Sequence, residues 1–153
     1  MFKKVFYAAV ALLASFSGRA QGLWAELGEQ DILPGFRSNS NYSTLGATKH
    51  IFVQGTAAYR AHQATAATSG NLLGVMQNNP GIDEAMSIAC AGLSKVVAGG
   101  ALTANAIITT NASGRAAVVG SGEMAAGRVL EAAGADGDVV TAMLFHPVRW
   151  AGA

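Results

Sequence analysis

From about His50 to Pro147 the chain is a series of short apolar runs, each ended by Gly, Asn, Asp or Pro. Turn residues recur about every 8 to 12 residues, a spacing typical of small sandwiches and barrels. No long amphipathic helical pattern intervenes, which argues against a parallel α/β sheet. The sequence therefore predicts an all-β domain, a small sandwich or barrel of about eight short strands. The predicted strands are 51–53, 72–76, 85–91, 93–98, 106–110, 115–119, 127–133 and 138–146.

The last of these runs is apolar on both faces. Val139, Met143 and Phe145 alternate with Val140 and other apolar residues before Pro147, which is expected to end the strand. A strand of this kind is typically central in its sheet or covered by a second layer.

The first 47 residues predict an N-terminal arm that is partly helical, followed by a β domain over residues 48–153. Residues 1–22 combine a basic start, a short apolar run and small residues, as a secretory signal does. The same residues also suit a retained apolar helix that docks on a partner. Residues 28–47 are rich in Gly, Pro, Ser and Asn and predict a loop.

The composition favours a protein that works in an assembly. Charged residues make up only 12% of the chain and hydrophobic residues 51%. Ala and Gly together contribute about a third, so each buried side chain removes little area from water. Such a chain gains stability when neighbouring subunits cover its uncharged surface. The net charge of +1 gives no long-range attraction to nucleic acid.

Residues that carry chemistry are scattered. None of the three histidines lies at metal-ligand spacing from another ligand. Asp136 and Asp138 fit a turn better than a pair of catalytic carboxylates. Cys90 alternates with apolar neighbours and is expected to be a buried, inert thiol. We therefore expect no enzyme activity, no cofactor or metal, no small-molecule substrate and no nucleic-acid partner.

From about Thr48 to Leu144 the chain resembles the phage capsid cement, or head decoration, proteins of the small, Ala- and Gly-rich type. The resemblance covers about two-thirds of the chain and lies in the order and spacing of its motifs. The motifs are Leu73-Gly74-Val75-Met76-Gln77-Asn78, Ala91-Gly92-Leu93-Ser94-Lys95-Val96, Thr109-Thr110-Asn111-Ala112-Ser113-Gly114-Arg115-Ala116, Gly127-Arg128-Val129-Leu130-Glu131-Ala132-Ala133 and Gly137-Asp138-Val139-Val140.

The resemblance implies a structural virion protein that binds major capsid protein on the outer surface of the shell, often as a homo-trimer, and stabilises the mature capsid. Exposed aromatic residues and Arg make good interface anchors. Capsid contact is therefore expected at five residues of the arm, Leu23, Trp24, Leu33, Phe36 and Arg37. The alternative is an exported bacterial surface or matrix protein, secreted after removal of residues 1–20 as a signal peptide.

Overall fold

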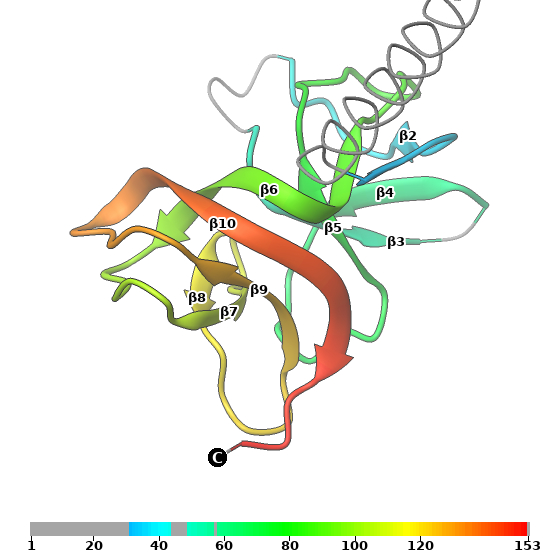
Figure 1. Cartoon of the computed structure of the whole chain (residues 1–153). Helices are drawn as coiled ribbons and strands as arrows, with labels where there is room; N and C mark the ends of the chain where they lie inside the picture. The colour runs from blue at the N-terminus through cyan, green and yellow to red at the C-terminus, as the bar shows by residue number, and fades with distance from the viewer. Residues whose placement is uncertain (1–30, 44–48, 57, 153) are drawn as a thin grey trace, which may run out of the picture.

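The computed structural model describes residues 31–43, 49–56 and 58–152, which form ten strands and no helix (Figure 1). The all-β prediction is confirmed. The predicted helical part of the arm lies outside the described residues, among which no helix is long and apolar enough to cross a membrane. The strands are β1 (Asp31–Leu33), β2 (Arg37–Ser38), β3 (Phe52–Gly55), β4 (Arg60–Gln63), β5 (Leu72–Met76), β6 (Ile88–Gly99), β7 (Ile107–Thr110), β8 (Ala116–Val118), β9 (Met124–Val129) and β10 (Asp136–Arg149).

Five of the strands close into a small barrel. Strand β6 pairs with β10, β10 with β9, β9 with β7, and β7 with β8. The ring closes where β8 returns to β6 in parallel, with Ala98 opposite Ala116. Closure leaves these strands without the unpaired edge that an open sheet presents. The barrel is one of the two architectures that the turn spacing predicts.

The other strands form a sheet that shares β6 with the barrel. The first residues of β6 pair with β5 on one side and β1 on the other, and β3, β4 and β2 follow β5. Strand β6 passes from this sheet to the barrel near Gly92, whose φ of 86° lies in the left-handed region that glycine tolerates. Gly92 stands opposite Leu144, at the first residue of β6 that pairs with β10.

Two apolar clusters lie inside these two parts. The larger cluster fills the barrel and extends to β3 and β5 of the open sheet. It consists mostly of Ala and Val, with Phe52 of β3 and Ile108 of β7 among its few bulky members. The smaller cluster lies in the open sheet, where Tyr42, Met76 and Ile88 are buried and Leu33 and Phe36 pack against them. Tyr42 also accepts a hydrogen bond at its hydroxyl from the Gln63 backbone N–H, at 2.6 Å.

Several predicted strand bounds are wrong. The runs 85–91 and 93–98 form the single strand β6, because Gly92 bends the strand without ending it. Strand β10 continues through Pro147 to Arg149, with an irregularity in its pairing to β9 between Leu144 and Val148 that accommodates the missing N–H. Strand β9 begins before its predicted start and ends at Val129.

Strand β10 is central, as predicted, because it pairs with β6 and with β9. In the described part of the chain, no second layer covers the outer face of β10. Val140, Ala142 and Leu144 point into the barrel and are buried, whereas Val139 and Met143 on the outer face are exposed.

Residues 31–43, the described part of the predicted arm, contribute β1 and β2 where a loop was predicted. Strand β1 lies beside β6 and strand β2 runs parallel to β4. Residues 44–48 lie outside the described residues, so the boundary predicted between residues 47 and 48 stays a prediction.

Candidate docking site

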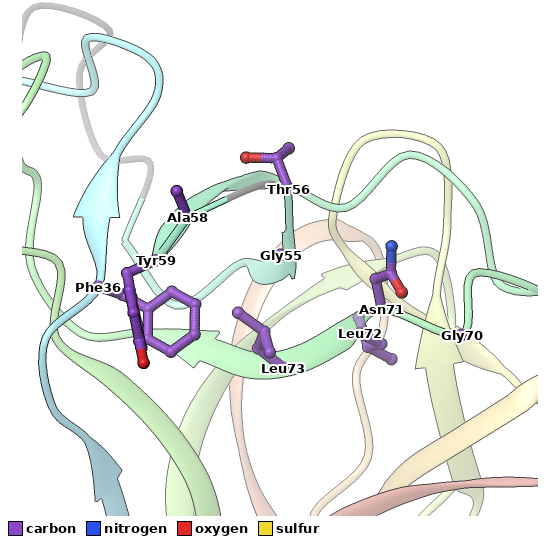
Figure 2. Close-up of a pocket in the computed structure, with 9 residues that line it drawn as sticks. All are labelled: Phe36, Gly55, Thr56, Ala58, Tyr59, Gly70, Asn71, Leu72 and Leu73. Atoms are coloured by element: carbon purple, nitrogen blue, oxygen red, sulfur yellow. The ribbon is translucent and has the colours of Figure 1, made fainter.

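An open pocket of about 520 Å³ lies beside the turn between β3 and β4 (Figure 2). Phe36 and Tyr59 form one end, Leu72 and Leu73 form the floor, and Asn71 supplies an amide at the other end. The pocket opens widely to solvent, and its lining offers no charged side chain. A shallow surface of this kind can accept an apolar side chain of a protein partner.

The turn that borders the pocket has a costly backbone conformation. Ala58 and Tyr59 have φ values of 50° and 59°, the left-handed region that turns of this type normally give to Gly, Asn or Asp. Each such residue costs about 1–2 kcal/mol relative to an ordinary conformation. The Tyr59 side chain nevertheless stays 73% exposed. Residues with a strained backbone cluster at binding sites, and here the strained turn exposes an aromatic ring to solvent.

Phe36 holds the Tyr59 ring from the side. The two rings meet edge to face, with centroids 6.1 Å apart and an interplanar angle of 66°. Contacts of this geometry contribute about 0.5–1.5 kcal/mol beyond the area they bury. Because Phe36 also packs against the smaller core cluster, the exposed ring is anchored to the interior.

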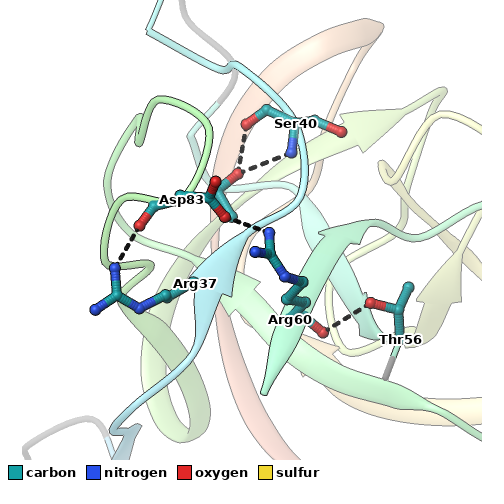
Figure 3. Close-up of polar contacts among 6 residues, drawn as sticks. Arg37, Ser40, Thr56, Arg60 and Asp83 are labelled. Carbon is teal, nitrogen blue, oxygen red and sulfur yellow. Dashed lines mark hydrogen bonds and ion pairs between the residues drawn. The ribbon is translucent and has the colours of Figure 1, made fainter. Parts of the chain in front are cut away.

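Arg37 binds two residues with left-handed backbones, Tyr59 and Asp83, and Figure 3 shows its contact with Asp83. Its backbone N–H donates to the Tyr59 carbonyl at 2.9 Å, and its Nη1 donates to the Asp83 carbonyl at 2.8 Å. Asp83, whose φ is 62°, forms an ion pair with Arg60 through its carboxylate. Both partners of that pair are well exposed, so it contributes no more than about 1 kcal/mol. The network fixes the direction of the Arg37 side chain.

We refer to Phe36, Arg37, Tyr59 and Arg60 as the β2 surface, because they lie on or directly beside β2 and its partner β4. An exposed aromatic ring next to two guanidinium groups is the composition that dominates protein interfaces. Among the described residues no group of three His, Cys, Asp or Glu side chains could hold a metal ion.

The structure brings together two of the five residues predicted for capsid contact, Phe36 and Arg37. Leu33 packs against the smaller core cluster instead of standing free on an arm. Leu23 and Trp24 lie outside the described residues. Sequence reasoning missed Tyr59 and Arg60, because a parallel pairing between β2 and β4 brings them to Arg37 and no local pattern indicates that pairing.

The fold is similar to that of the N base of head fiber gp8.5 of bacteriophage phi29. The TM-score is 0.55 at 18% sequence identity, and the match covers 74% of this chain and 94% of that chain. The phage protein thus shares this arrangement of strands along almost its whole solved length. No family model matches the chain, and no curated protein matches it.

Proposed function

We propose that this chain is a structural protein of a phage virion that binds the outer surface of the head and acts as a cement protein on the mature shell. The fold similarity to the base of a phage head fiber carries the proposal. The order of motifs between Thr48 and Leu144, which resembles that of cement proteins, also supports it. The first observation concerns the arrangement of the strands and the second concerns the order of sequence motifs.

The β2 surface is the proposed contact with major capsid protein. Tyr59 and Arg37 combine a large exposed contact with donors that are already oriented, so little side-chain freedom is lost when they bind. Leu23 and Trp24 are proposed to add contacts from the preceding segment. The role requires no catalysis, cofactor, metal, nucleic acid or small-molecule substrate.

A cement protein stabilises the shell by mass action. Binding that bridges neighbouring capsid subunits favours the assembled state over the separated one, by an amount that grows with the concentration of free protein over its Kd. We propose that the protein acts as a homo-trimer, because three linked contacts raise the overall affinity without a tight single site.

Heads of the encoding phage that lack this protein provide the test. Purified protein added to such heads should co-sediment with them until a fixed number of copies per head is reached. The temperature at which the heads release DNA should rise as the sites fill. Protein that stays in the supernatant at every concentration would overturn the proposal. Saturable binding with an unchanged release temperature would overturn the cement role and leave head binding intact.

The competing function, an exported bacterial β domain, depends on residues 1–20 being a cleaved signal. The intact mass of the natural protein separates the two. A chain that begins at Gln21 and is recovered from the culture medium would favour export, whereas virion protein that retains residues 1–20 would exclude it.

A further inference from the structure

The two arginines of the β2 surface differ in how their charges are met. Arg60 forms an ion pair with the Asp83 carboxylate, whereas Arg37 Nη1 donates to the Asp83 backbone carbonyl at 2.8 Å (Figure 3). In the described ranges of the chain, no carboxylate forms an ion pair with Arg37. One guanidinium charge of the surface is therefore neutralised within the chain, and the other is not.

A single carboxylate lies between the two arginines. The neighbouring acid, Glu84, turns its carboxylate into its own turn, where Oε2 accepts the Gly81 backbone N–H at 2.7 Å. The Arg37 guanidinium contacts the carbonyl of Asp83, so it lies within a side chain's length of the carboxylate of the same residue. Asp83 thus has two cations within reach and forms its ion pair with Arg60.

The exposed Arg37 side chain is arranged as an anion receptor. A guanidinium carries five N–H donors, and the bond from Nη1 to a neutral carbonyl orients the group without cancelling its charge. A planar guanidinium held in this way suits a carboxylate, which it can bind through two parallel hydrogen bonds. The β2 surface offers one unpaired cation beside an exposed ring, which fits a single acidic side chain, whereas a nucleic-acid backbone is met by several cations.

We infer that Arg37 binds a carboxylate of the partner protein, and that Arg60 keeps Arg37 available by holding the Asp83 carboxylate. Arg60 is then a positioning residue, which acts on binding through Asp83 and makes no contact of its own with the partner. Without Arg60, the Asp83 carboxylate turns to Arg37 and competes with the partner for it. In naming major capsid protein as that partner, this assignment rests on the proposed function.

Four substitutions in the full chain test the assignment by sedimentation with heads. Arg37→Gln should weaken head binding by at least about tenfold and make it less sensitive to salt. Arg60→Gln should weaken it by about two- to fivefold, the range expected when an exposed ion pair forms in competition. Asp83→Asn, which tolerates the left-handed φ of 62°, should bind as wild type. Arg128→Gln removes an exposed, unpaired charge from β9 and is the matched control, which should also bind as wild type.

The double variant Arg60→Gln/Asp83→Asn separates positioning from direct contact. It should recover wild-type head binding, because no carboxylate remains beside Arg37 to compete with the partner. Urea midpoints of all these variants should stay close to that of wild type, since the pair that is removed is exposed.

The free protein gives a second readout that involves no heads. The nitrogen-15 NMR signal of the Arg37 Nε–H group changes when a carboxylate pairs with the guanidinium. This signal should move clearly between Arg60→Gln and the double variant, and little between wild type and Asp83→Asn.

Weak head binding by the double variant would overturn the inference, because Arg60 would then contact the shell itself. Wild-type binding by Arg37→Gln or by Arg60→Gln would overturn it as well, and would leave head binding as such intact. An Arg37 signal that ignores Asp83 in both backgrounds would exclude the competition. A wild-type protein that ignores heads, but whose Arg37 signal changes as expected, would refute the proposed function and confirm the role of Arg60.

Discussion

Phe36 and Tyr59 meet edge to face across the mouth of the pocket, with ring centroids 6.1 Å apart. The Phe36 ring packs against the smaller core cluster, whereas the Tyr59 ring lies on a strained turn and is exposed to solvent. This arrangement makes the role of Tyr59 testable without damage to the fold, because most of its side chain buries nothing in the free protein.

Tyr59→Ala should weaken binding to phage heads by at least about tenfold, as expected for an aromatic residue at the centre of an interface. The free energy of unfolding should fall by about 0.5–1.5 kcal/mol, since the edge-to-face contact is the main interaction lost. Sedimentation with heads and urea unfolding measure the two effects. Val118→Ala, which removes an exposed side chain from the barrel, is the control and should leave head binding unchanged. Equal head binding by Tyr59→Ala and wild type would remove the β2 surface from the account.

Ala58→Gly should stabilise the free protein by about 0.5 kcal/mol. Replacing the left-handed alanine removes a conformational cost of about 1–2 kcal/mol from the folded state. The greater freedom of glycine in the unfolded chain offsets part of that gain. Thermal unfolding measures the difference. Ala112→Gly, in an exposed turn without a positive φ, should instead lower stability. A loss of stability in both variants would contradict the strain assigned to Ala58.

Gly74→Ala should destabilise the sheet by about 2–3 kcal/mol, because the packed backbone must shift to admit a methyl group. An added Cβ would lie 2.1 Å from the Ala89 carbonyl oxygen, and the φ of 157° adds strain. Gly70 has open space around its Cα, so Gly70→Ala should change stability by less than about 0.5 kcal/mol. Urea midpoints of the two variants give the comparison. Similar midpoints would show that β5 and β6 are not in such close contact.

Burial and the nearby Lys49 and Lys95 charges lower the pKa of His50 below its ordinary value of 6.5. The unfolded chain therefore binds the proton first as the pH falls, so the free energy of unfolding should decrease below about pH 6.5. His50→Asn should flatten this decrease, since Asn tolerates the left-handed φ of 70° and does not titrate. Denaturation at pH 7 and pH 5 measures the effect. His146→Asn, on an exposed part of β10, should keep the wild-type decrease, and an unchanged decrease in His50→Asn would contradict the assignment.

Burial, together with the charge of Asp31, raises the pKa of the Cys90 thiol above its ordinary value. Its Sγ donates to the Asp31 carbonyl at 3.1 Å, which ties β1 to β6. Because the thiolate is the reactive form, alkylation by iodoacetamide at pH 8 should be at least about tenfold slower in folded than in denatured protein. Equal rates would show that β1 does not cover the thiol.

The sequence predicted the all-β class because turn residues divide the chain after residue 50, and it predicted Leu72–Met76 with the bounds that the structure has. Strand β4 was missed because its residues, Arg60 to Gln63, show no apolar alternation. The single strand β6 was read as two, since a glycine inside a strand and a glycine after one look alike in sequence.

Two of the four residues of the β2 surface, Phe36 and Arg37, were predicted from the sequence. Phe36 and Arg37 stood out as an exposed aromatic residue and a base in a polar segment. Tyr59 reaches them through the pairing of β2 with β4, and the strain at Tyr59 depends on backbone angles that no composition reveals. Long-range pairing of short polar strands therefore limits what the sequence alone can show.

Cryo-electron microscopy of heads incubated with the protein tests the central claim most directly. We expect density for the barrel at regular positions on the outer surface of the shell, with Tyr59 and Arg37 facing major capsid protein. Heads without added density, or barrels bound with the β2 surface turned to solvent, would contradict it.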